Sequence, residues 1–113
     1  MPHVIIDHSA DIGDAATLDA LCEAVFQALA AHSAIPHPAA LKVRTLAAGA
    51  QRLGTEPQSY AHATLLLLPG RSAEVKADLA RVILDVLVAV LPDVGSLSVN
   101  LAELDAAYVK RVL

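Results

Sequence analysis

Aromatic and basic side chains are scarce in this sequence of 113 residues, and their scarcity excludes whole classes of function. Aromatics make up 3% of the chain, tryptophan is absent, and eight Lys and Arg residues against twelve Asp and Glu give a net charge of −4. Nucleic-acid binding needs a basic face, and single-strand binding also needs aromatic stacking platforms. We therefore expect no nucleic-acid partner. An anionic ligand could be held only where a few basic side chains converge.

Cysteine and long apolar runs are also lacking. Cys22 is the only cysteine, so no intramolecular disulfide can form, and its helical spacing among apolar residues predicts a small core side chain. The longest apolar stretch, Arg81–Leu91, is interrupted by Asp85 and is too short to span a membrane. The start of the chain has neither the basic nor the long apolar region of a signal peptide. These features predict a cytoplasmic protein without a membrane partner.

What the sequence does contain is an excess of hydrophobic residues, which make up 56% of the chain, while charged residues make up 18%. This composition excludes disorder for most of the chain. The length suits one domain over residues 1–113 and not two. So few charges solvate a large monomer surface poorly, and we therefore expect an oligomer with apolar contacts.

The spacing of apolar residues predicts strands and helices in alternation. β-Branched runs and the alternation of apolar with polar side chains indicate strands over His3–His8, Leu41–Leu46, Tyr60–Leu68 and Leu97–Leu101. Helical spacing predicts a helix from Leu18 to near His32, with Thr17 as its N-cap. A second helix is expected to begin after Ser72 and to stop at Pro92.

The order of these elements is β-α-β followed by a second β-α-β. We expect an α+β fold in which two tandem β-α-β units form a four-stranded mixed sheet with two helices on one face. The other face of that sheet would be bare, and the second helix carries an extra apolar stripe at Leu84, Val88 and Leu91. Oligomerisation would cover both surfaces.

Pro2 is the most informative single residue. Removal of Met1, which is usual before a small residue, would make Pro2 a secondary amine at the start of a strand. An α-amino group has a pKa near 8, and burial or neighbouring cations lower it. An amine of that kind suits proton transfer near neutral pH. Proline at position two is common, and on composition alone the favoured interpretation is that Pro2 only sets an extended start to the chain.

The basic residues offer two candidate anion sites. Arg71 follows Pro69-Gly70 and precedes a helix start, which is a rigid place for an anion clamp or for a solvated loop arginine. Lys42 and Arg44 share one face of their strand and make a basic pair. The histidines lack metal-ligand spacing, although His8 could lie near the mouth of a site. We expect neither a metal nor a cofactor.

Three segments, in this order and spacing, resemble the 5-carboxymethyl-2-hydroxymuconate isomerase family of the tautomerase superfamily: MPHVIIDHS, LKVRTL and YAHATLLLLPGRS. The resemblance implies a homotrimer and catalysis without a cofactor. It implies that Pro2 removes a proton from a dienol and returns it at another carbon, with Arg71 as the second catalytic residue. Lys42 and Arg44 match two basic positions that bind substrate carboxylates. Lys42 departs from the arginine of the family, and lysine cannot form a bidentate fork with a carboxylate.

Two functions follow from this sequence. The first is an isomerase that ketonises a carboxylated, 2-hydroxymuconate-like dienol in the catabolism of aromatic compounds such as homoprotocatechuate. The alternative is a non-catalytic oligomeric α+β module that binds a small anion, because a fold does not determine a function. The state of the amino terminus separates them: with Met1 attached, the Pro2 nitrogen is an amide and cannot act as a base.

Overall fold

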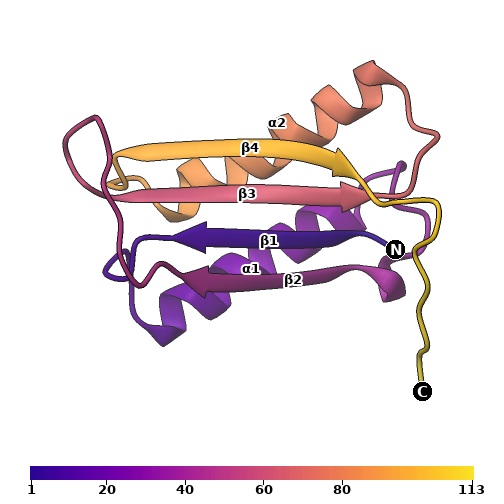
Figure 1. The fold of residues 1–113 in the computed structure, drawn as a ribbon, viewed down its shortest axis with the longest axis horizontal. Helices are drawn as coiled ribbons and strands as arrows, with labels where there is room; N and C mark the ends of the chain where they lie inside the picture. The colour runs from indigo at the N-terminus through magenta and orange to yellow at the C-terminus, as the bar shows by residue number, and fades with distance from the viewer.

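Two helices pack on a single sheet of four strands in the computed structural model, which describes residues 1–113 (Figure 1). The strands are β1 (His3–His8), β2 (Lys42–Ala47), β3 (Tyr60–Leu67) and β4 (Ser96–Glu103). The helices are α1 (Ala15–Ala30), α2 (Ala73–Val90) and a short 3-10 turn, η1 (Pro38–Ala40). Neither long helix combines the length and the apolar character that a membrane crossing requires.

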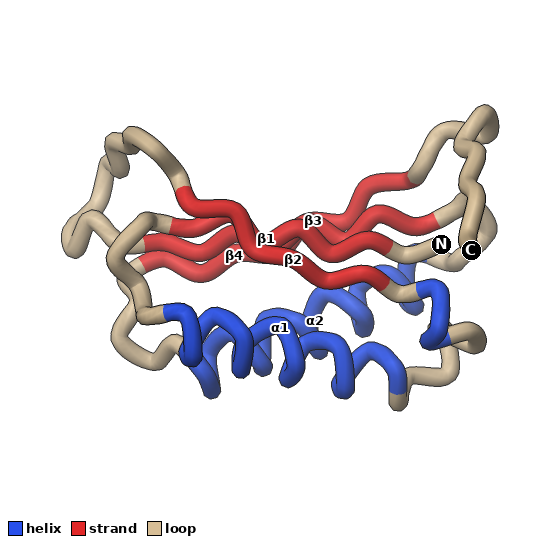
Figure 2. Tube along the Cα trace, turned by 90° about the horizontal axis from the view of Figure 1, so that it is seen from below, coloured by secondary structure: helices blue, strands red, loops and turns tan.

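The sheet has the strand order β2-β1-β3-β4. β1 runs parallel to β2 and β3 runs parallel to β4, while the central pair β1 and β3 is antiparallel. Both helices lie on one face of the sheet, and its other face is bare (Figure 2). The predicted α+β fold of two tandem β-α-β units with a mixed sheet is therefore confirmed.

The core lies between the sheet and the helices and follows from the two periodicities of the sequence. Alternate strand residues such as Val4 and Ile6 point toward the helices and are fully buried. Helix residues spaced by four complete this core, namely Leu21, Val25 and Leu29 from α1 and Leu79, Ile83 and Leu87 from α2. Each such side chain contributes roughly 1.5–3 kcal/mol to the free energy of unfolding through burial. This layer holds the strand ends, and hence the site described below, in fixed positions.

Some element boundaries differ from the prediction. α1 begins at Ala15 with Asp14 as its N-cap, because the Asp14 carboxylate accepts hydrogen bonds at 2.9 Å from both the backbone and the hydroxyl of Thr17. Thr17 therefore lies inside the helix. The predicted cap of α2 is confirmed, since the Ser72 hydroxyl accepts from the Val75 amide at 3.2 Å. β4 continues to Glu103 because β3 pairs with it over its whole length.

Three side-chain predictions have mixed outcomes. His8 does not lie near the site: it is 1% exposed at the far end of β1 from Pro2, where its Nδ1 lies 2.8 Å from the Ser9 carbonyl oxygen. Cys22 is half-buried, and burial raises the pKa of its thiol. In the extra stripe on α2, Val88 is 52% exposed, whereas Leu91 is buried.

Candidate active site

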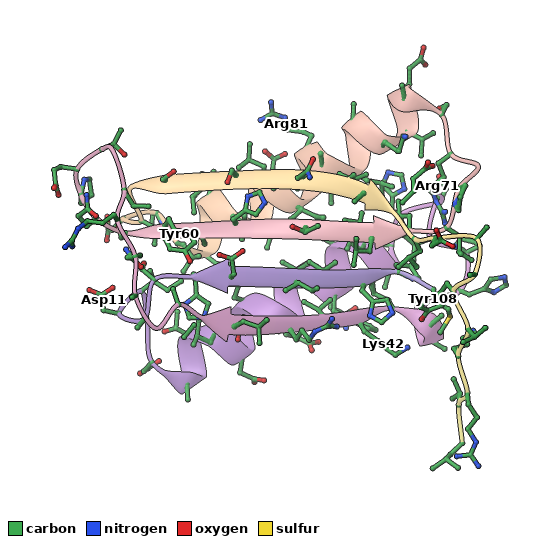
Figure 3. All side chains as sticks on the ribbon, viewed as in Figure 1. Asp11, Lys42, Tyr60, Arg71, Arg81 and Tyr108 are labelled. Atoms are coloured by element: carbon green, nitrogen blue, oxygen red, sulfur yellow. The ribbon has the colours of Figure 1, made fainter.

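A cavity of about 470 Å³ opens where β1 begins and β3 ends. Met1 and Pro2 line it together with apolar side chains from the turn after α1 and the end of β3, among them Ile35 and Leu68. Its polar lining comes from His37, from the turn before α2 and from the C-terminal segment (residues 104–113). In Figure 3, Arg71, Lys42 and Tyr108 gather at this end of the sheet, and Tyr60 lies at the opposite end.

Pro2 lies at the inner side of this cavity. Its ring is buried, and its carbonyl oxygen accepts a hydrogen bond at 3.1 Å from the Lys42 amide, so the pairing of β1 with β2 fixes its position. Met1 is attached to the Pro2 nitrogen and lines the same cavity. In this state the Pro2 nitrogen is an amide without basicity. Removal of Met1 would leave an amine at the same place.

The cavity is positively charged although the protein is acidic. Its lining contains Arg71 and Lys110 and no Asp or Glu residue. Burial lowers the pKa of the amino-terminal amine below its usual value of 8.0, and the positive charges of Lys110, Arg71 and Lys42 lower it further. A larger fraction of this amine is therefore neutral near pH 7 than of a fully solvated amino terminus. The same cations attract an anionic ligand.

Arg71 is held rigidly by main-chain carbonyl groups. Its Nε and Nη2 atoms donate to the Ala34 oxygen at 3.1 and 2.9 Å, and Nη1 donates to the Leu68 oxygen at 3.4 Å. Gly70, just before it, has a φ of 125°, a backbone conformation that residues other than glycine rarely adopt. One N–H group on each terminal nitrogen of the guanidinium is left for a ligand. The structure thus brings Arg71 and Pro2 into one cavity.

Ala34, whose carbonyl oxygen binds Arg71, is held through its own backbone amide by a histidine. The Nδ1 atom of His32 accepts from the Ala34 amide at 3.0 Å, so Nε2 carries the hydrogen and donates to the Asp78 carboxylate at 2.6 Å. This chain of contacts ties the turn after α1 to α2. His32 and Asp78 therefore position Arg71 from outside the cavity.

The two basic residues of β2 lie differently from each other. Lys42 is exposed and donates to the Ala40 oxygen at 3.3 Å, beside the cavity, which Ala40 lines. Arg44 lies farther along the bare face of the sheet, where its Nη1 atom is 3.3 Å from Nδ1 of His3. The structure brings Lys42 to the rim and does not bring Arg44 into the lining.

Sequence reasoning missed the residues of the C-terminal segment. Tyr108 and Lys110 line the cavity, and Nζ of Lys110 lies 2.6 Å from the Met1 sulfur. The segment is tied down by the Leu104 amide, which donates to the Leu67 oxygen at 2.7 Å. The mixed composition of this segment gave no periodic signal that could have placed it here.

The arrangement can bind an anion and move a proton. An amine with a lowered pKa would lie beside apolar side chains, and fixed cations would hold carboxylates or a developing enolate. A fixed guanidinium is well suited to a carboxylate, because its planar N–H groups match the two oxygens.

Comparison with known families and solved structures identifies the family and the fold of the chain. The 5-carboxymethyl-2-hydroxymuconate isomerase family matches residues 2–111 of the chain. No curated protein sequence matches it.

Several solved structures share the fold. A 5-carboxymethyl-2-hydroxymuconate isomerase from Deinococcus radiodurans R1 superposes with a TM-score of 0.82 at 23% identity, covering 97% of this chain and 88% of that one. A 5-carboxymethyl-2-hydroxymuconate delta-isomerase gives 0.73 at 16% identity, over 100% and 87% of the two chains. Malonate semialdehyde decarboxylase gives 0.65 at 20% identity, over 94% and 88%. At these identities the structures establish the fold.

Proposed function

Because the chain belongs to the 5-carboxymethyl-2-hydroxymuconate isomerase family and is an isomerase, we propose that it ketonises a carboxylated, 2-hydroxymuconate-like dienol. The neutral amine takes the hydroxyl proton of the dienol, which leaves a dienolate and a protonated amine. The amine then returns the proton to a carbon of the dienolate, and a ketone forms. No electron is gained or lost, so the reaction needs no redox cofactor. Such a substrate belongs to the breakdown of aromatic compounds, of which homoprotocatechuate is one.

Pro2 is the proposed base, freed by removal of Met1. The observation that carries this proposal is the position of the amino terminus in a cavity lined by cations and free of carboxylates. Desolvation and the charges of Lys110, Arg71 and Lys42 lower the pKa of the Met1 amine, and an amine on Pro2 would lie deeper in the same field. A base whose pKa lies near the working pH transfers protons in both directions.

Arg71 and Lys42 are the proposed partners of the substrate carboxylates. Arg71 has free N–H groups on a fixed guanidinium, which favours a defined carboxylate geometry. Lys42 supplies a point charge at the rim. Arg44 is the weaker candidate for direct contact, because it is bonded to His3 outside the lining.

The test is turnover of 2-hydroxymuconate by the Met1-free protein, followed by the loss of the dienol absorbance. The proposal expects ketonisation far above the spontaneous rate, measured in the same buffer. Binding of the dicarboxylate without turnover would instead identify a non-catalytic module that binds a small anion. Absence of both would remove the cavity as a site for carboxylated dienols.

A homotrimer is part of the proposal. β2 and β4 are edge strands with unpaired backbone groups, and such edges are usually covered in natural proteins. The bare face carries Leu46, which is 54% exposed. Pairing of edges around a three-fold axis would enclose the bare faces of three sheets. Sedimentation equilibrium at micromolar concentration should give three times the mass of the chain, and a stable monomer would contradict this.

A further inference from the structure

Tyr108 takes part in a chain of contacts that runs from the bare face of the sheet to the cavity. The Nη1 atom of Arg44 lies 3.3 Å from Nδ1 of His3, and Nε2 of His3 lies 2.9 Å from the Tyr108 hydroxyl. A guanidinium can only donate hydrogen bonds, so Nδ1 of His3 is the acceptor. The hydrogen of a neutral His3 is therefore on Nε2, which donates to the Tyr108 oxygen.

His3 is held in that neutral form. Burial lowers the pKa of its imidazole first, and the charges of Arg44, Lys42 and the amino terminus lower it further. The rings of His3 and Tyr108 meet edge to face, with their centroids 5.9 Å apart and an interplanar angle of 80°. This contact restricts the tyrosine ring, and the hydrogen bond fixes the position of its oxygen.

The hydrogen of the Tyr108 hydroxyl is left without a partner in the chain. The oxygen accepts from His3, and no other protein group bonds to it. Tyr108 lines the cavity beside Pro2 and Arg71. An oxygen that accepts one hydrogen bond becomes a better donor in a second, because neighbouring hydrogen bonds polarise each other. The geometry therefore leaves a polarised O–H donor on a residue that lines the cavity.

We propose that the Tyr108 hydroxyl donates a hydrogen bond to the substrate oxygen that becomes negative in the dienolate, and that His3 and Arg44 position it. This inference rests on the proposed function and adds a catalytic residue to it. A fixed donor that meets charge only as it develops stabilises the transition state more than the bound substrate. Loss of the donor should therefore lower kcat more than it raises KM. In this arrangement Arg44 acts through His3.

The first test replaces the hydroxyl alone. Tyr108→Phe keeps the ring against His3 and should lower kcat by about a hundredfold with little change in KM. Tyr60→Phe is the matched control, since Tyr60 is the only other tyrosine and lies at the opposite end of the sheet. It should leave kcat unchanged. Equal kcat in wild type and Tyr108→Phe would overturn the proposal.

The second test separates positioning from folding. Arg44→Met should lower kcat severalfold in the wild-type background and have no further effect on kcat in Tyr108→Phe, because the positioned group is already gone. If Arg44 served only the stability of the fold, Arg44→Met would lower kcat by the same factor in wild type and in Tyr108→Phe. Equal losses of kcat in the two backgrounds would show that Arg44 does not position Tyr108.

The third test needs no turnover. Adipate and 2-oxoadipate differ by one oxygen beside a carboxylate, and calorimetry measures their affinities for the Met1-free protein. We expect wild type to bind 2-oxoadipate about fivefold more tightly, as one hydrogen bond allows, and Tyr108→Phe to bind both equally. An unchanged preference in Tyr108→Phe would refute the hydroxyl contact even if the protein ketonises dienols. A lost preference in a protein without turnover would uphold the contact and refute the proposed reaction.

Discussion

Replacing Arg71 by alanine has two separable consequences. The side chain donates to the Ala34 oxygen through Nε and Nη2 at 3.1 and 2.9 Å, so the truncation leaves a half-buried carbonyl without its partner. That loss should lower the free energy of unfolding by about 1–2 kcal/mol. Thermal unfolding of the purified variant measures this part.

The second consequence concerns the substrate. A charge-assisted contact between Arg71 and a carboxylate is worth about 1.5–3 kcal/mol. At about 1.4 kcal/mol for each factor of ten, Arg71→Ala should lower kcat/KM on 2-hydroxymuconate by roughly 10- to 140-fold. A rise in KM alone would mean that Arg71 binds substrate and transition state equally, and a fall in kcat would mean that it stabilises the dienolate.

Two further variants sharpen the assay. Arg71→Lys returns the charge without the planar fork and should recover only part of the activity. Arg81→Ala is the matched control, because Arg81 is 68% exposed on α2 and approaches only Asp85, at 4.0 Å. It should change neither unfolding nor kcat/KM by more than the error. An Arg71→Ala protein with unchanged kcat/KM would show that the fixed guanidinium does not meet the substrate.

Three other predictions follow from the same structure. Because the proposed Pro2 amine must be neutral to act as base, kcat/KM should rise with pH through the pKa of that amine. The charge of Lys110 lowers the pKa of the amine on Met1, next to Pro2. Lys110→Met should therefore move the acid limb of the pH–rate profile to higher pH. Ile83→Ala, at a fully buried position, should lower the free energy of unfolding in urea by about 2–5 kcal/mol. Asp14→Ala removes the cap of α1 and should cost about 1 kcal/mol in the same assay, with Asp11→Ala, an exposed neighbour, as the control.

The fold was predictable because its elements carry strong local signals. The β-branched run of β1 alternates between core and bare face as the pattern indicates, and Ser72 caps α2 as a serine before a helical run should. The start of α1 was misplaced because Asp14 and Thr17 are both good caps, and the alanines between them have no apolar periodicity. A local pattern cannot separate two such caps, and the hydrogen bonds of the folded chain decide which residue caps the helix.

The site was predictable only in part. Pro2 and Arg71 are identified mainly through the resemblance to the isomerase family, because composition alone favours Pro2 as an extended start to the chain and does not separate Arg71 from a solvated loop arginine. The contact between His3 and Tyr108 joins residues that lie 105 positions apart, and no local pattern contains that information. Arg44 was paired with Lys42 because both share a strand face, yet the cavity opens beyond the start of that strand, so only Lys42 reaches its rim.

A free amine on Pro2 is the proposed base, and the same protein can be assayed with that amine blocked and with it free. A protein with a removable extension before Pro2 is assayed for ketonisation of 2-hydroxymuconate before and after cleavage, with the mass of each form verified. We predict no activity above background before cleavage, full activity after it, and the same unfolding temperature in both states. Equal activity in the blocked and the cleaved protein would contradict this prediction and would show that another residue is the base.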